Sequence, residues 1–539
     1  MNSFIQLTKA FFLSGFNVNK KKQNQRSAFK ALLIFGIVLF VVSFLYNALY
    51  MKISTETGLA LEDYMLIVLV VDALIVFTTC IFQMQQTIFK TKDYEFLESL
   101  PVKKSIIVSA KIFAVYLIGL FEDLLITIPA IILYLVFVGT GYAMYYALII
   151  FISTIFVSIV PILFSSIIST IIALITARMK NQSLFSIILY LVFFAGIFTF
   201  SFMFGSSTGS GNSNQITKII NILPHFKLVA LAQDMSKWYM FLIFIAIHIV
   251  SYALVAFFIG LVYRPMNTFL GNYKIHEEYK SSKNVSNLSV SKTLLKKDLN
   301  MIFKKSQYAL NAFLGPIMGL MMGIFFILMP SFMGNEFESA SAEELQQMVA
   351  IFMAMIPALM MLFNSMSSST SASISLEGQY IYMLASYPIT GKDIIKAKMK
   401  AGLLVPIVVN LIAGITLSII ISVMYGFYLE LIFQLMIIPS LVTLLTSIVG
   451  MLCGLRWAKF DFQNEMQVLK NSACVSFPLL FVTVPMLMMM GLTITLNIMF
   501  AGYFVAFGVD VLILSIAIII TYNALKKNSE SMFRKALTR

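Results

Sequence analysis

The sequence predicts an all-α integral membrane protein, with about twelve transmembrane helices arranged as two parallel six-helix repeats. Of its 539 residues, 60% are hydrophobic and only 12% are charged, whereas a soluble domain usually carries about 25% charged residues. Its longest apolar runs exceed the roughly 20 residues that a helix needs to cross a bilayer. These runs are continuous rather than alternating, which favours helices over a β-barrel.

Twelve apolar segments are candidate spans. Those of the first half are 30–51, 63–86, 112–138, 143–175, 184–204 and 238–263. Those of the second half are 308–332, 346–367, 401–425, 428–454, 472–491 and 495–523. We therefore divide the chain into three parts. The first half, 1–263, includes an N-terminal amphipathic segment. A cytoplasmic linker with a second amphipathic segment, 264–307, leads to the second half, 308–539.

The basic residues set the orientation. With the N-terminus inside, 34 of the 38 Lys and Arg residues fall in inside segments, as the positive-inside rule requires. This predicts a multi-pass protein of the cell membrane with both termini cytoplasmic. It also explains the net charge of +14 without a nucleic-acid partner.

The two halves repeat in sequence at a constant offset of 287 residues. The matched pairs are Leu97 and Leu384, Ser99 and Ser386, Pro101 and Pro388, and Lys111 and Lys398. An amphipathic stretch precedes each half, at 4–16 and at 291–303. Six spans per half is an even number, so both halves enter the membrane in the same sense.

Two predicted cytoplasmic loops, one in each half, contain a short aromatic-rich helix before a proline. Their candidate residues are Asp93, Tyr94, Glu95, Phe96, Leu97, Ser99 and Pro101, and Tyr382, Leu384, Ser386 and Pro388. Proline disfavours α geometry at the preceding residue, so the helices should stop at Leu100 and Tyr387. Such a helix can act as a lever for a partner protein. The alternative is an interfacial helix anchored by its aromatic residues.

With these loops, the amphipathic N-terminal stretch and a further amphipathic segment at 216–235, the chain resembles the permease subunits of bacterial ABC exporters, in the two-type permease group. The resemblance covers most of the chain. It implies that 93–101 and 380–388 are similar to coupling helices, which sit in a cleft of an ATPase subunit. The second half departs from the pattern, because its predicted outer loop, 492–494, is too short for a matching outer segment.

The chain itself has no ATPase motif. Its only Gly-Lys pair, Gly391-Lys392, lacks the upstream glycine of a P-loop. We therefore expect no enzyme activity and no cofactor in this chain, and two copies of a separate ATPase that binds ATP and Mg²⁺. A membrane enzyme or scaffold would be a third class, but no catalytic constellation is visible.

Several polar residues lie inside the apolar spans, where charge is costly and often functional. They are Asp72, Glu122, Asp123, Asn410 and Asp510, of which Asp123 matches Asn410 at the repeat offset. They either line a substrate path between the halves or form interhelical hydrogen bonds. The rival function is an ion-coupled secondary transporter with six-plus-six helices, in which Glu122 or Asp123 carries protons.

Glycines at four-residue spacing indicate close helix packing. They are Gly315, Gly319 and Gly323 on the seventh span, and Gly450 and Gly454 on the tenth. A sharper hypothesis places the seventh span at the seam between the halves.

The three histidines are far apart and the three cysteines show no ligand spacing, so no metal site is predicted.

Overall fold

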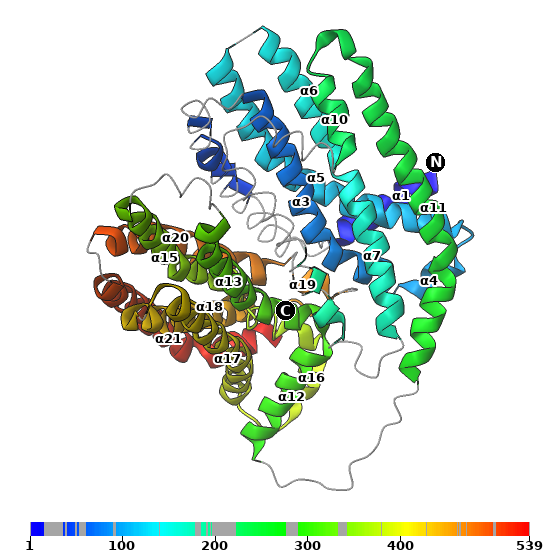
Figure 1. Ribbon diagram of the computed structural model, residues 1–539. Helices are drawn as coiled ribbons and strands as arrows, with labels where there is room; N and C mark the ends of the chain where they lie inside the picture. Colours follow the sequence, from blue (N-terminus) through cyan, green and yellow to red (C-terminus); the bar gives the residue numbers. More distant parts are fainter. Residues whose placement is uncertain are drawn as a thin grey trace. The chain divides into compact units, whose positions relative to one another are not determined.

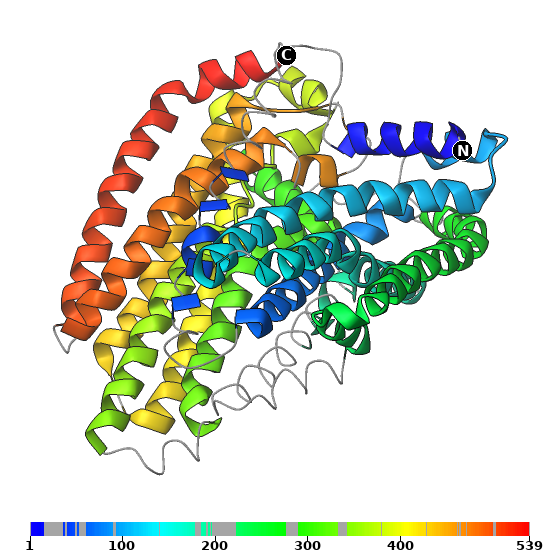
Figure 2. The same cartoon turned by 90° about the horizontal axis from the view of Figure 1, so that it is seen from above.

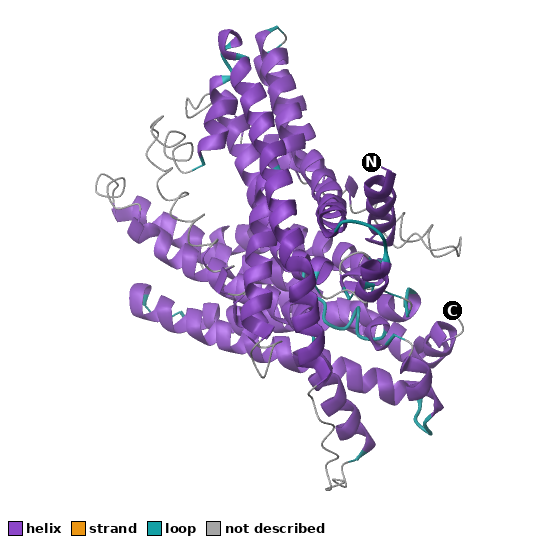
Figure 3. Cartoon of the chain, turned by 90° about the vertical axis from the view of Figure 1, so that its right-hand side faces the viewer, coloured by secondary structure: helices purple, strands orange, loops and turns teal. Residues whose placement is uncertain are grey.

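The computed structural model contains only helices and loops among the residues that it describes (Figure 3). The described residues are 2–15, 36–37, 40–41, 43–48, 51–52, 61–89, 93–139, 141–177, 185–189, 192–193, 196, 223–275, 289–332, 342–378, 380–426, 428–460, 462, 465–469, 472–499 and 503–537.

The chain forms two compact units. Unit 1 comprises Met1–Gln25, Leu32–Tyr190 and Ser207–Lys280, and unit 2 comprises Arg26–Ala31, Leu191–Ser206 and Ser281–Arg539. Each unit has its own buried apolar clusters.

Unit 1 is built on helices that pack around α3 and α5 (Figure 1). Its helices are α1 (Asn2–Gly15), α3 (Leu61–Ile88), α4 (Tyr94–Ser99), α5 (Lys104–Val138), α6 (Tyr142–Val157), α7 (Ile159–Ala177), α10 (Pro224–Leu231) and α11 (Tyr239–Ile275). The amphipathic helix α1 lies alongside the first part of α5 (Figure 2). The ring centroids of Phe4 and Phe113 are 5.7 Å apart in this contact.

Unit 2 is built around α18, which packs against α15, α17, α20 and α21. Its helices are α12 (Val290–Lys304), α13 (Ser306–Phe332), α15 (Ala342–Ser365), α16 (Tyr380–Ser386), α17 (Gly391–Tyr425), α18 (Leu429–Arg456), α19 (Met466–Leu469), α20 (Ala473–Met499) and α21 (Tyr503–Leu537). The amphipathic helix α12 packs on α17, as α1 packs on α5 in unit 1.

Nine helices of the described part are long and apolar enough to cross a membrane. They correspond to nine of the twelve predicted spans. A tenth, predicted at 346–367, is present as the shorter apolar stretch Val349–Ser365. Half of the span predicted at 30–51 and most of that predicted at 184–204 lie outside the described residues. Exposed apolar side chains such as Val136 and Met488 are suited to contact with lipid.

Several helix ends differ from the sequence prediction. Helices α5 and α17 begin at Lys104 and Gly391, and α11 continues to Ile275. Hydropathy marks where a helix is apolar, whereas its hydrogen bonds continue into polar residues. Residues 492–494 are helical because α20 continues to Met499, so the predicted outer loop there is wrong. The fourth predicted span, 143–175, is interrupted at Ser158, between α6 and α7.

The glycines on α13 lie where backbones approach closely within unit 2. A Cβ atom at Gly315 would lie 2.7 Å from the carbonyl oxygen of Phe363, and one at Gly323 would lie 2.7 Å from Leu417. Gly319 faces Met360 of α15. The close approaches of α13 at these glycines are to α15 and α17. A seam between the halves stays a prediction.

Candidate functional site

Helix α4 is a short helix of six residues with one buried and one exposed face. Leu97 is buried at 2% exposure, whereas Phe96 is 66% exposed. The Ser99 hydroxyl donates to the carbonyl oxygen of Phe96 at 2.7 Å. The chain then becomes extended at Leu100, with ψ of 140°, as expected before Pro101.

Helix α16 has the same construction. Leu384 is buried at 8% exposure, whereas Tyr380 is 73% exposed. The Ser386 hydroxyl donates to the carbonyl oxygen of Met383 at 2.7 Å, three residues back as in α4. Both predicted stops before proline are confirmed.

The turns that follow the two helices are also alike. The Val102 amide donates to the Leu100 carbonyl at 2.8 Å, and the Ile389 amide donates to the Tyr387 carbonyl at 2.7 Å. Each tight turn spans the aligned proline. We call α4 and α16 with these turns, 93–102 and 380–389, the paired short helices. The same pattern of sequence has therefore produced the same local structure twice.

A buried lysine lies behind α16. The Lys398 side chain of α17 is 1% exposed and contacts Asp298 of α12 at 3.0 Å and Glu377 at 2.5 Å. Its ammonium group also donates to the Ser373 carbonyl at 3.2 Å. A second cation, Lys297, contacts the same Oε1 atom of Glu377 at 2.5 Å, and its side chain is 41% exposed. These four charges sum to zero, which makes their burial tolerable.

The environment of Glu377 shows how this cluster is balanced. Burial raises the pKa of the Glu377 carboxyl group, but the ammonium groups of Lys398 and Lys297 lower it more strongly. Its net pKa therefore lies below the ordinary value. Glu377 precedes α16 by three residues, so the cluster fixes the start of that helix to α12 and α17.

The aligned lysine of unit 1, Lys111, also lies near a carboxylate and near the upstream amphipathic helix, but at longer distances. The Lys111 side chain of α5 is 2% exposed and lies 3.8 Å from Asp93, the residue that precedes α4. It donates to the Tyr263 hydroxyl of α11 at 3.5 Å. Its ammonium group lies 5.5 Å from the centre of the Phe11 ring of α1, within cation–π range.

Further ion pairs hold α4 from its other end. Glu98 contacts Lys104 of α5 at 2.8 Å and Arg264 of α11 at 3.3 Å. In both units, therefore, the lysine aligned by the repeat contacts the upstream amphipathic helix and a carboxylate just before the short helix. The charge pattern of the sequence indicated only that these lysines lie in basic loops.

A serine-rich segment, 366–378, which is buried from Ser369 onwards, connects α15 to α16. Its side chains donate to backbone carbonyls of neighbouring helices: Ser369 to Gly402 of α17 at 2.7 Å, and Thr370 to Ser447 of α18 at 2.6 Å. Gly450 and Gly454 of α18 make room for it, since a Cβ atom at Gly454 would lie 2.5 Å from the Ser371 carbonyl oxygen. Sequence reasoning missed this segment, although a run of serine and threonine disfavours helix.

Four of the five predicted intramembrane polar residues make hydrogen bonds within their own units. Thr127 donates to Asp72, and Ser158 donates to Asp123. Thr493 contacts both oxygens of Asp510, at 3.0 and 2.9 Å. Asn410 donates to Thr443 at 2.9 Å, and Glu122 is only partly buried. These hydrogen bonds of Asp72, Asp123, Asn410 and Asp510 run between neighbouring helices, and a substrate path between the halves stays a prediction.

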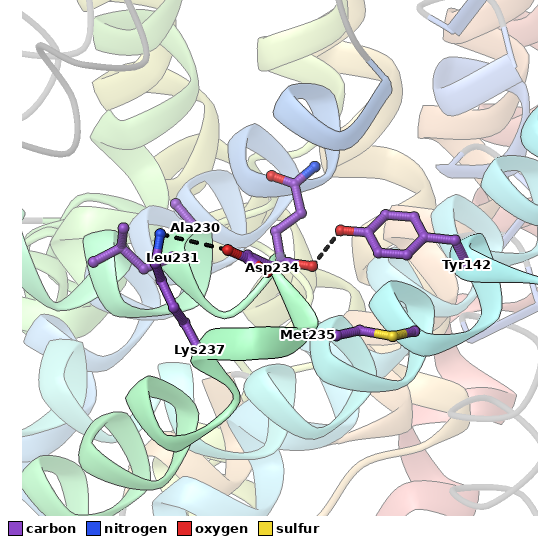
Figure 4. Close-up of a pocket in the computed structure, with 7 residues that line it drawn as sticks. Tyr142, Ala230, Leu231, Asp234, Met235 and Lys237 are labelled. Carbon is purple, nitrogen blue, oxygen red and sulfur yellow. Dashed lines mark hydrogen bonds and ion pairs between the residues drawn. The ribbon is translucent and has the colours of Figure 1, made fainter.

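The amphipathic segment predicted at 216–235 is described from Leu223 onwards, where Pro224 opens α10. After α10, a shallow cavity of about 450 Å³ lies against the start of α6 (Figure 4). Tyr142 donates there to the Gln233 carbonyl, and Lys237 pairs with Asp234 at 3.5 Å (Figure 4). The described residues contain no group of three or more potential metal ligands.

An all-helical chain with this many long apolar helices is a polytopic integral membrane protein. Its sequence matches the model of a family described as membrane protein of 12 TMs over residues 24–528. Because this match covers most of the chain, the protein belongs to that family. No curated protein and no solved structure matches the sequence.

Proposed function

We propose that the chain is the permease subunit of an ATP-driven ABC transporter that exports a hydrophobic or amphipathic substrate across the cell membrane. ATP and Mg²⁺ bind to two copies of a separate ATPase subunit on the cytoplasmic side, where both termini lie. The observation that carries the proposal is the shared construction of the paired short helices. Each buries a leucine, exposes aromatic side chains and is held by a buried lysine.

The contacts of these helices are suited to transmitting force. Each short helix is followed by one tight turn and then by a helix of 35 residues. Ion pairs from Glu98 to Lys104 and from Glu377 to Lys398 brace the junctions. A push on the exposed face of α4 or α16 would therefore move α5 or α17 rather than bend the connection.

The exposed aromatic residues define where the ATPase would bind. Phe96 is 66% exposed in α4, and Tyr382 is 48% exposed in α16. Aromatic side chains are enriched in protein interfaces because they bury a large area at low entropic cost. The paired short helices expose aromatic side chains at the end of each unit where the predicted basic loops lie.

A photo-crosslinking amino acid placed at Phe96 or Tyr382 tests this proposal in cell membranes. We expect both positions to crosslink to a P-loop ATPase subunit, identified by mass spectrometry. Phe258 and Tyr522 serve as matched control positions, because they are 60% and 48% exposed but lie within long apolar helices. Crosslinking of the ATPase at the controls alone, or at no position, would contradict the proposal.

Proline variants provide the functional arm of the test. Pro101→Ala and Pro388→Ala remove the restriction that ends each short helix, so ATP-dependent transport should fall while the protein still reaches the membrane. Pro129→Ala in the middle of α5 controls for loss of a proline elsewhere. Equal transport by all three variants would count against a coupling role.

The rival function is an ion-coupled secondary transporter. The observation that favours it is the pair of buried carboxyl groups at Asp72 and Asp123, which form no ion pair among the described residues. It requires that Glu122→Gln or Asp123→Asn abolish transport and that transport continue without ATP. Transport that needs ATP and survives both substitutions would exclude this rival.

A further inference from the structure

Two aspartates lie in the membrane-spanning part of unit 1. Asp72 belongs to α3 and Asp123 to α5, and both side chains are completely buried. Both helices are long and apolar enough to span a membrane. An ionised carboxylate at this depth is costly unless a cation neutralises it.

The hydrogen bonds place the two side chains about one helical turn apart along α5. Thr127 donates to the Oδ2 atom of Asp72, and Ser158 donates to the Oδ2 atom of Asp123. Thr127 follows Asp123 by four residues on α5, so the two lie one turn apart on the same face. The Asp72 carboxyl group therefore contacts α5 one helical turn from Asp123.

A separate observation concerns the other oxygen of each group. The Oδ1 atoms of Asp72 and Asp123 are buried and accept no hydrogen bond from any residue that the structure describes. No described Lys, Arg or His forms an ion pair with either. The other ionisable groups that interact with Asp123 are Glu122, which has the same sign, and Tyr116, whose hydroxyl donates to the Ile155 carbonyl.

We propose that Asp72 and Asp123 form a proton-binding site within unit 1, in which the two carboxyl groups hold one shared proton. A hydronium ion gives up the proton, which forms an O–H bond with the Oδ1 atom of one aspartate, and a neutral water molecule is left. The charge of the pair then changes from −2 to −1. Two like carboxyl groups at close range cannot both ionise readily, so one retains the proton.

A proton suits this site better than a metal cation. Ca²⁺ and Mg²⁺ require about six or more oxygen ligands, whereas the pair offers two buried oxygens without a partner. The Thr127 and Ser158 hydroxyls already direct their hydrogens at the carboxyl groups. A single proton needs only one free carboxyl oxygen and one acceptor.

Unit 2 shows that helix packing alone does not require a carboxyl group at the position that Asp123 occupies in unit 1. Asn410, which aligns with Asp123, links α17 to α18 by donating to Thr443 at 2.9 Å and to the Pro439 carbonyl at 3.4 Å. This neutral amide connects its helices without any ionisable group. The carboxyl pair thus gives unit 1 a capacity that the docking of an ATPase does not need.

The test uses the full-length protein in lipid nanodiscs. Dicyclohexylcarbodiimide reacts with protonated carboxyl groups in membranes, and mass spectrometry locates the adduct. We expect an adduct on Asp72 or Asp123 at neutral pH, its loss at alkaline pH, and no protection by sodium chloride. Protection by sodium would overturn the assignment of a proton in favour of a metal cation.

Infrared spectroscopy supplies a second measurement that does not depend on access of the reagent. The carbonyl band of a protonated carboxyl group should be present at neutral pH and lose intensity in Asp72→Asn/Asp123→Asn. Asp510→Asn is the control, because Asp510 is a single carboxyl with Thr493 at both oxygens. An unchanged band in the double variant would overturn the proposal. The labelling experiment needs no variant, so it tests the proton-binding site even if the double variant fails to fold. Neither result bears on the crosslinking to the ATPase.

Discussion

Replacing Lys398 by methionine should destabilise unit 2 because it removes the cation at the centre of the buried cluster. Asp298 and Glu377 each have side chains that are only 6% exposed. Without Lys398, Asp298 keeps a buried negative charge, whereas Glu377 still contacts Lys297 at 2.5 Å. Removing one partner of a buried pair costs about 3–5 kcal/mol. We expect about 3 kcal/mol, because one of the two carboxylates retains a cation.

Lys297→Met is the matched control. Lys297 contacts the same carboxylate at the same distance, but its side chain is 41% exposed. Pairs of this kind contribute about 0–1 kcal/mol. The two substitutions therefore change the same net charge and differ mainly in burial.

The measurement is thermal unfolding of the full chain in detergent. A folding unit of this size loses about 2–4 °C per kcal/mol, so Lys398→Met should lower the midpoint by roughly 6–12 °C. Adding Asp298→Asn should restore part of the loss, because it removes the unpaired charge. If Lys398→Met were no worse than Lys297→Met, or if the second substitution only added to the loss, the buried ion cluster would not be what stabilises α16.

Three further outcomes follow from the same contacts. Lys111→Met should cost less than Lys398→Met, about 1–3 kcal/mol, because Asp93 lies 3.8 Å away and is 21% exposed; the same melting experiment checks this, and an equal or larger loss would contradict it. Glu377 has a lowered pKa, so its stabilising effect is present above the pKa of the unfolded chain and is lost as the pH falls. Wild type should therefore lose more stability on acidification than Glu377→Gln does. Parallel curves of stability against pH for the two proteins would refute the role given to Glu377. Gly454→Ala should cost about 1–3 kcal/mol, since its Cβ atom would lie 2.5 Å from the Ser371 carbonyl oxygen, whereas Gly491→Ala, with nothing within 4 Å, should be neutral or stabilising in the same assay.

Much of the local structure was predictable because it depends on short-range rules. The helix stop before Pro101 follows from the clash between the proline ring and the preceding residue. The glycines at 315, 319 and 323 indicated close packing because they lack a Cβ atom, and a Cβ atom added at each would lie 2.7–3.2 Å from its nearest neighbour. Helix ends such as Met499 were missed, because hydropathy does not report where backbone hydrogen bonding ends.

Composition and hydropathy by themselves determined the class of protein, since long continuous apolar runs leave few structures other than membrane helices. They could not show which lysines are buried. Lys398 looked like one more basic loop residue until packing brought Asp298, one hundred residues away, within 3.0 Å. The two buried aspartates likewise became a pair only when α3 packed against α5. Charge at a site depends on partners that are distant in the chain, and only tertiary structure brings those partners together.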